Sequence, residues 1–230
     1  MNLDTNPFFR SQIIDMKVEG SKLQLVISPV ELNFGNVIGN LIRRILIKQI
    51  PSFSIIGYKL DRLSKNHSFI KRQSLDEFSD FEDSLTRVRI CEKFDASSSN
   101  LLGDLSFWIK GFKQGPNHLY AGDLVCPDNF EILNQELCLF EIPYGVQFEY
   151  SLLFRKGIGF ILSKSHKGLP KGMVGLDSYF NPIVHVSYHV NTYSLYEDLI
   201  LYLETDGRIS PKVAYNYVHL FFQSKFGLIL

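Results

Sequence analysis

The carboxylates and glycine motifs that could carry catalysis are scattered in this 230-residue sequence. Asp177, Glu204 and Asp206 form no pair or cluster with the spacing of an active site. There is no G-x-S-x-G turn, no Walker loop and no H-E-x-x-H pair. Gly157 and Gly159 are a fragment of a phosphate-binding loop, and a strand rather than a helix is expected after them. We therefore expect no catalytic residue in this chain.

Two histidines offer the chemistry of metal ligands, but their surroundings favour another interpretation. His185 and His189 alternate with Ser187 and Asn191 in the stretch IVHVSYHVN, so all four share one face of a predicted strand. A zinc site needs a third protein ligand, and none follows nearby in the sequence. We expect a polar sheet face here, with no metal site and no cofactor.

Arg43 and Arg44 lie in FGNVIGNLIRRILIKQIPSF, which predicts an apolar helix from Phe34 that Pro51 ends. On a helical wheel both arginines share the polar half with Asn40 and Ile47. The arginine fork pairs with carboxylates and is favoured at protein interfaces. The polar half is therefore either a solvated face or a small mixed patch that binds a partner.

The other half of this wheel is a continuous apolar arc about 180° wide, broader than the stripe that an ordinary surface helix needs. The predicted helix PKVAYNYVHLFFQSKF near the other end of the chain is also apolar over about half of its circumference. Such helices either pack within one chain or form a dimer interface. The residues that we predict for a dimer interface are Phe34, Val37, Leu41, Ile45, Tyr217 and Phe221.

Strands accompany both helices. A hairpin with a turn at Gly20 is predicted from Gln12 to Ser28, and Asn33 is the expected N-cap of the first helix. In IVHVSYHVN we expect Val184, Val186, Tyr188 and Val190 on one face. A second strand, LILYLET, a tight turn and the N-cap signal Ser210-Pro211 follow.

The middle of the chain is predicted to be mostly β structure. SIIGYKLDRL, LTRVRICEKF, LLGDLSFWIKGF and LFEIPYGVQFEYSLLFRKGIGFIL read as strands. The polar stretch from Ser64 to Ser84 is expected to be a loop with one short helix. The prediction is an α+β chain in two parts. Residues 1–53 and 178–230 form one domain, a sheet with two long helices, and residues 54–177 form an inserted β-rich domain.

Composition excludes several classes of protein. Lys plus Arg and Asp plus Glu are both 24, which argues against a general nucleic-acid binder but leaves room for a local basic patch. No window approaches the run of roughly 18 apolar residues of a membrane span, and no secretory signal is expected. The three cysteines favour free thiols in a reducing compartment. Abundant Phe, Tyr, Ile, Asn and Lys fit an AT-rich genome.

Four segments, in order, resemble the motifs of one family. ISPVELNFGNVIGNLIRRILIKQIPSFSI is similar to the signature of the amino-terminal domain of the bacterial and plastid-type RNA polymerase α subunit. GIGFIL, LDSYFNPIVHVSYHVN and LILYLETDGRISPKVA are similar to three later motifs of that family. Ile158 replaces the arginine of the family's G-R-G, and the stretch from Ser64 to Ser84 matches poorly, so no contacts are transferred to it.

The resemblance implies a homodimer, built mainly from the two end helices, on which the β and β′ catalytic subunits of a DNA-directed RNA polymerase assemble. It implies that Arg44 and Ile47 contact the β subunit, and we add their neighbours Arg43 and Asn40. The chain would be a non-catalytic subunit of a nucleotidyltransferase complex. The Mg²⁺ would belong to the catalytic subunit, and no direct sequence-specific DNA contact is expected.

The sequence stops at Leu230, where bacterial members of the family continue into a small DNA-binding domain. This end and the AT-type composition favour a plastid protein, with the bacterial cytoplasm as the alternative and a truncated sequence as the competing explanation. An archaeal or nuclear scaffold subunit is a second possibility. A soluble α+β enzyme is a third, and it would predict a monomer with a polar pocket in the middle of the chain.

Overall fold

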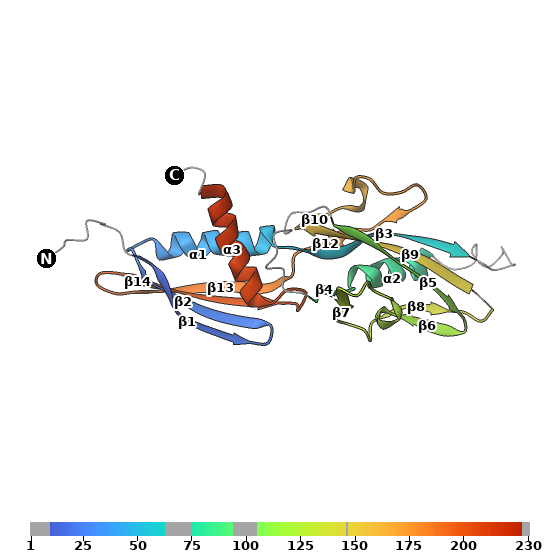
Figure 1. Ribbon diagram of the computed structural model, residues 1–230, viewed down its shortest axis with the longest axis horizontal. Helices are drawn as coiled ribbons and strands as arrows, with labels where there is room; N and C mark the ends of the chain where they lie inside the picture. Colours follow the sequence, from blue (N-terminus) through green and yellow to red (C-terminus); the bar gives the residue numbers. More distant parts are fainter. Residues whose placement is uncertain (1–9, 63–74, 94–104, 146, 227–230) are drawn as a thin grey trace. The chain divides into compact units, whose positions relative to one another are not determined.

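The computed structural model describes residues 10–62, 75–93, 105–145 and 147–226 (Figure 1). The chain divides into two compact units: unit 1 is residues 1–50 and 181–230, and unit 2 is residues 51–180. The predicted boundaries lie three residues away, at 53/54 and 177/178. Helices and sheets are both present, in agreement with the α+β class. Among the described residues, none of the helices combines the length and apolar character that a membrane crossing requires.

Unit 1 is a four-stranded antiparallel sheet with the strand order β1-β2-β14-β13 and two helices. The two helices cover the face on which Leu25 of β2 lies opposite Leu201 of β14, and α3 crosses α1 steeply (Figure 1). The other face carries polar side chains, such as the opposed Lys22 and Glu204. The elements are β1 (Gln12–Glu19), β2 (Lys22–Val30), α1 (Gly35–Gln49), β13 (Ile183–Thr192), β14 (Glu197–Thr205) and α3 (Pro211–Phe226).

The helix boundaries of unit 1 follow from local signals, with one exception. Pro51 follows α1, and Ser210 caps α3 because its Oγ accepts a hydrogen bond from the backbone N–H of Val213. The prediction of Asn33 as the N-cap of α1 is wrong. Asn33 has a φ of +69° and lies in the turn before the helix, and Phe34 occupies the cap position without a side-chain hydrogen bond.

The predicted alternation of β13 is also wrong at one position. Val186 lies on the covered face with Tyr188 and Val190, but Val184 is 61% exposed. The cause is a β-bulge. Ile183 pairs with Thr205 and the next paired residue is His185, so Val184 is an extra residue that points away from the core.

Unit 2 is built around a second antiparallel sheet with the strand order β11-β3-β9-β5. Two-stranded ribbons, β4-β7, β6-β8 and β10-β12, complete the unit together with one α-helix and two 3-10 helices, η1 (Ala121–Asp123) and η2 (Ser163–Ser165), among the described residues. The elements are β3 (Pro51–Arg62), α2 (Leu75–Thr86), β4 (Ile90–Glu92), β5 (Ser106–Gln114), β6 (Asn117–Tyr120), β7 (Phe130–Ile132), β8 (Cys138–Ile142), β9 (Gln147–Ile158), β10 (Phe160–Ile161), β11 (Val174–Gly175) and β12 (Ser178–Tyr179).

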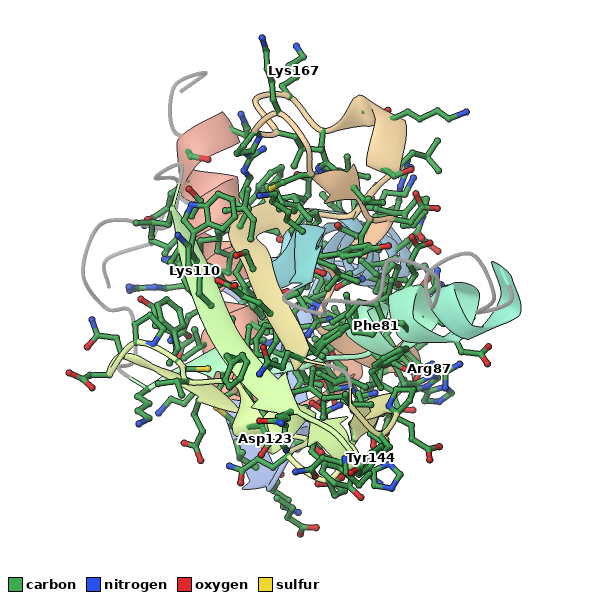
Figure 2. All side chains as sticks on the ribbon, turned by 90° about the vertical axis from the view of Figure 1, so that its right-hand side faces the viewer. Phe81, Arg87, Lys110, Asp123, Tyr144 and Lys167 are labelled. Atoms are coloured by element: carbon green, nitrogen blue, oxygen red, sulfur yellow. The ribbon has the colours of Figure 1, made fainter. Side chains whose placement is uncertain are left out.

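The core of unit 2 is rich in aromatic side chains. Phe107 of β5 stacks on Phe154 of β9 with a ring-centroid distance of 5.2 Å, and on Phe130 at 4.4 Å. Phe81 of α2 is buried among strand residues on the same side of the sheet (Figure 2). On the other face a smaller cluster surrounds the fully buried Phe180. Strand β3 is covered on both faces, which explains its continuous apolar run.

The polar stretch before residue 85 contains a helix, as expected, but this helix extends further than predicted. Residues 64–74 lie outside the described part of the chain, but α2 extends to Thr86. Leu85, at which a strand is predicted to begin, therefore lies in the last turn of a helix, and β4 spans only Ile90–Glu92. The apolar spacing of Phe81, Leu85 and Val88 serves a helix and its following turn, because all three enter the core cluster.

Candidate protein-binding surface on helix α1

Helix α1 lies close to the sheet because two of its residues lack side chains. A Cβ atom at Gly39 would come within 2.6 Å of the Tyr188 ring, and one at Gly35 within 2.8 Å of Val190. These glycines are four residues apart and so occupy one side of the helix. Ile42 and Leu46 are buried on the same side. One side of α1 is therefore fully used in packing on β13 and β14.

Glu197 of β14 holds the beginning of α1. Its Oε2 accepts a hydrogen bond of 2.8 Å from the backbone N–H of Gly35. A carboxylate at this position satisfies one of the unpaired N–H groups of the first turn and interacts favourably with the helix dipole. This hydrogen bond is the main reason that the pKa of Glu197 lies below its usual value.

Asn181 holds the end of α1. Its side-chain amide donates a hydrogen bond to the carbonyl oxygen of Ile47. The carbonyl oxygen of Asn181 accepts a hydrogen bond of 2.7 Å from Nη2 of Arg208, whose Nε lies 2.8 Å from Oδ2 of Asp206. The side chains of Arg208 and Asp206 are only 6% and 9% exposed. A buried ion pair therefore connects the turn before α3 to the last turn of α1.

The outer side of α1 carries an apolar row that nothing in the described chain covers. Phe34 is 55% exposed, Val37 58% and Leu41 37%. We call these three residues the α1 ridge. Their spacing of three and four residues places them on neighbouring turns. On α3, Leu220 is also exposed, at 46%. Exposed apolar residues that lie side by side mark a protein-binding site in many proteins.

The structure separates the six residues predicted for a dimer interface into two groups. The ridge residues offer surface, and Phe221 is partly exposed beneath the ammonium group of Lys225, which lies 5.9 Å from its ring centroid. Ile45 and Tyr217 are 3% and 9% exposed within the chain, so they are core residues that support the helices. The wide apolar arc of α1 is thus two surfaces, one facing the sheet and one facing outward.

The four residues predicted to bind the β subunit lie beside the ridge with unequal exposure. Asn40 and Arg44 are exposed, and Ile47 is partly buried. Arg43 also has an exposed side chain, but its Nε donates a hydrogen bond of 3.3 Å to the carbonyl oxygen of Val186. Arg43 is therefore tied to β13, whereas Arg44 leaves its guanidinium fork in solvent.

The groups considered for catalysis are engaged in local structure. Nε2 of His185 lies 3.2 Å from Oγ of Ser187, as expected for a polar sheet face. Lys22 lies 3.9 Å from Glu204. Within the described residues there is no group of three or more His, Cys, Asp or Glu side chains that could hold a metal ion. The cysteines are free thiols, and burial raises the pKa of Cys126 to about 11, so this thiol is protonated at neutral pH.

Sequence reasoning missed Gly35, Gly39, Glu197 and Asn181 as supports of this surface. The role of the two glycines could have been predicted, because two glycines four residues apart inside a predicted helix indicate that one side of the helix packs closely on another element. Glu197 and Asn181 gave no local signal, since each acts on a helix that is more than 130 residues away in the sequence. Their roles depend on the fold.

A sheet of two chain ends, with α1 and α3 on one face and an exposed apolar row on α1, has the features of a subunit-association domain. The family described as the RNA polymerase Rpb3/Rpb11 dimerisation domain matches residues 28–217, and the chain belongs to this family.

Within the family the chain is similar to bacterial α subunits. It is 29% identical to the DNA-directed RNA polymerase subunit alpha of Helicobacter pylori strain J99 over 93% of this chain and 63% of that protein. It is 28% identical to the same subunit of Chlorobium phaeobacteroides over 81% and 56% of the two chains. For onion yellows phytoplasma the identity is 26% over 90% and 61%. The predicted resemblance to the α-subunit amino-terminal domain is confirmed, and the chain spans about three fifths of the length of these relatives.

Proposed function

We propose that this chain is a non-catalytic assembly subunit of a DNA-dependent RNA polymerase. Two copies would associate through unit 1, and the dimer would bind the β and β′ subunits. The observation that carries the proposal is the α1 ridge, an exposed apolar row on a helix whose opposite side is fully buried. The description of the family as a dimerisation domain supports the same interpretation.

The first step of the proposal is association of two copies through the ridge. A permanent homodimer interface is more apolar than ordinary surface, and its core is depleted in charge. Phe34, Val37 and Leu41 satisfy this condition, and α3 of the same unit also exposes Leu220 and part of Phe221. Full burial of an exposed apolar side chain contributes about 1.5–3 kcal/mol. The ridge side chains are about half exposed, so each would add about half of this value, and the two copies would contribute equivalent rows.

The second step is recognition of the β subunit by the polar side of α1. Arg44 offers a guanidinium fork for a carboxylate, and the partly exposed Ile47 adds an apolar contact beside it. Asn40 and Arg43 would border this contact. Because Asn181 fixes the last turn of α1, Ile47 is presented on a rigid element.

The two steps predict separable effects of substitution. Arg44→Ala and Ile47→Asp should leave the mass of the isolated dimer unchanged and abolish co-purification of the β subunit when the two proteins are produced together. Lys17→Ala, on exposed strand β1 of the same unit, is the control and should retain the β subunit. Full recovery of the β subunit with either α1 variant would contradict the assignment.

The proposal also assigns the catalytic role within the polymerase and the cellular compartment in which it acts. Nucleotidyl transfer would be carried out by the large subunits, and this chain would make no sequence-specific DNA contact. A plastid is proposed from the composition of the sequence, whereas the relatives named above are bacterial, so the bacterial cytoplasm is the alternative. Native mass spectrometry of the complex from its source would identify the accompanying subunits and thereby the type of polymerase.

A further inference from the structure

One stretch of unit 2 departs from the charge balance of the chain. Between Tyr150 and Leu176 there is no aspartate or glutamate, although the chain contains 24 of them. The same stretch contains five cationic residues, and three of them lie in the loop formed by residues 163–172, which we call the basic loop. The five residues are Arg155, Lys156, Lys164, Lys167 and Lys171.

Hydrogen bonds hold the basic loop in a defined conformation. At its start, the backbone N–H of Ser163 donates a hydrogen bond of 2.7 Å to Oδ1 of Asp177. In its middle, Nη1 of Arg155 donates a hydrogen bond of 2.9 Å to the carbonyl oxygen of Lys167. Asp177, the acidic residue that follows the stretch, is therefore engaged with the backbone. The loop presents its side chains from a fixed position.

Further contacts turn the apolar and titratable side chains of the loop inward. Nε2 of His166 lies 2.9 Å from the carbonyl oxygen of Leu176 and 3.1 Å from Oγ of Ser178. Leu169 packs against the core cluster around Phe180. The outward surface of the loop therefore consists of lysine, serine, glycine and proline residues.

The lysines of the loop are free to bind an anion. Lys164, Lys167 and Lys171 are exposed, and none of them forms an ion pair with another described residue. Figure 2 shows Lys167 pointing away from the unit at the tip of the loop. By contrast, Lys156 lies 3.9 Å from Glu92 and Lys113 is paired with Asp123.

We propose that the basic loop binds the phosphate backbone of double-stranded DNA. Lysine side chains, serine hydroxyls and backbone N–H groups are the usual phosphate ligands, and they position a protein on DNA without reading sequence. An acidic protein partner is a poorer fit, because protein-binding hot spots are enriched in Trp, Tyr and Arg, and this loop contains none of them. The inference rests on charge and exposure and does not depend on the proposed function.

The test is fluorescence anisotropy of the full chain with a labelled mixed-sequence DNA duplex, measured over a range of salt concentrations. A duplex of about 30 base pairs is long enough to present many phosphates. The triple variant Lys164→Gln, Lys167→Gln and Lys171→Gln should bind at least about tenfold more weakly at low salt. Its log–log salt slope should also be shallower, by about one for each lysine. The control removes the same charge from unit 1 through Lys17→Gln, Lys22→Gln and Lys212→Gln, all exposed, and should bind like the parent chain.

Three results would overturn the proposal. The parent chain could fail to bind the duplex at low salt, or the loop variant could bind as tightly as the control. The third is lysine-dependent binding to poly-L-glutamate without binding to the duplex, which would identify an acidic polypeptide as the ligand. Unchanged circular dichroism of both variants, expected because all six lysines are exposed, would show that the loss reports binding and not folding.

Discussion

Each unit carries a row of exposed apolar side chains. The two rows differ in the residues that lie between the apolar ones. On the α1 ridge, Phe34, Val37 and Leu41 lie on successive turns of one helix side. On strand β5 of unit 2, Trp108 and Phe112 are similarly exposed, at 41% and 56%.

A charge lies within the β5 row and is absent from the α1 row. Residues two apart share a strand face, so Lys110 lies between Trp108 and Phe112, and its ammonium group is 5.8 Å from the centroid of the Trp108 ring. β5 is also at the edge of its sheet, where a lysine opposes pairing with another strand. We therefore expect the uninterrupted α1 ridge to mediate association, and the β5 row, which is as exposed but contains a lysine, to remain free of a partner.

The largest expected effect concerns the aromatic core of unit 2, next to β5. Phe154→Ala removes a fully buried ring that stacks on Phe107 and should lower the free energy of unfolding of unit 2 by about 3–5 kcal/mol. Urea unfolding followed by circular dichroism measures the loss. Phe160→Ala, which truncates a 56% exposed ring in the same unit, should change stability by less than about 0.5 kcal/mol. Equal losses in the two variants would mean that this core is not as described.

A similarly large effect is expected for the buried ion pair near the end of α1. Arg208→Met leaves the carboxylate of Asp206 buried without its partner, and we expect a loss of about 3 kcal/mol. The double variant Asp206→Leu with Arg208→Met should recover part of this loss, because it removes both buried charges. A double variant that is less stable than Arg208→Met would contradict the pairing.

A smaller effect is expected where α1 meets the sheet. Replacing glycine by alanine inside a helix usually stabilises it by about 0.5–1 kcal/mol. At Gly39 the sign should reverse, because the added methyl group would overlap the ring of Tyr188, and overpacking costs about 1–3 kcal/mol. Thermal unfolding of Gly39→Ala measures the difference. If this variant were more stable than the parent chain, α1 would not lie as close to β13 as the structure shows.

The smallest effect is a pH dependence at the start of α1. Because the pKa of Glu197 is lowered in the folded state, its carboxylate stabilises the fold at pH above its usual value near 4.5, and this contribution is lost as the pH falls through the lowered pKa. The parent chain should therefore be more stable than Glu197→Gln at pH 7, and the difference should shrink at about pH 3. A difference that grows on acidification would exclude the hydrogen bond to Gly35 as its cause.

Sequence periodicity was sufficient for the elements whose signals are local. The β1-β2 hairpin, the end of α1 before Pro51 and the start of α3 after Ser210 lie where their turn and cap residues predict. The bulge at Val184 was not predictable, because it depends on pairing with β14. A short helix was expected between Ser64 and Ser84, but the end of α2 at Thr86 was not, because Leu85 opens a stretch that also alternates like a strand.

The candidate site was predicted less completely than the fold. A helical wheel identifies an apolar arc but does not divide it into a buried and an exposed side. The division requires the position of the sheet, which Gly35 and Gly39 fix by their close approach to Val190 and Tyr188. For this reason Ile45 was grouped with Val37, although only Val37 remains available to a partner.

The most direct test of the central claim is the mass of the chain in solution. Sedimentation equilibrium should give twice the 26.5 kDa of one chain for the parent protein. Val37→Asp on the α1 ridge should give monomers, whereas Phe112→Asp on β5 should remain dimeric, although the two parent side chains are 58% and 56% exposed. A monomeric parent chain, or a dimer that persists in Val37→Asp, would contradict the account.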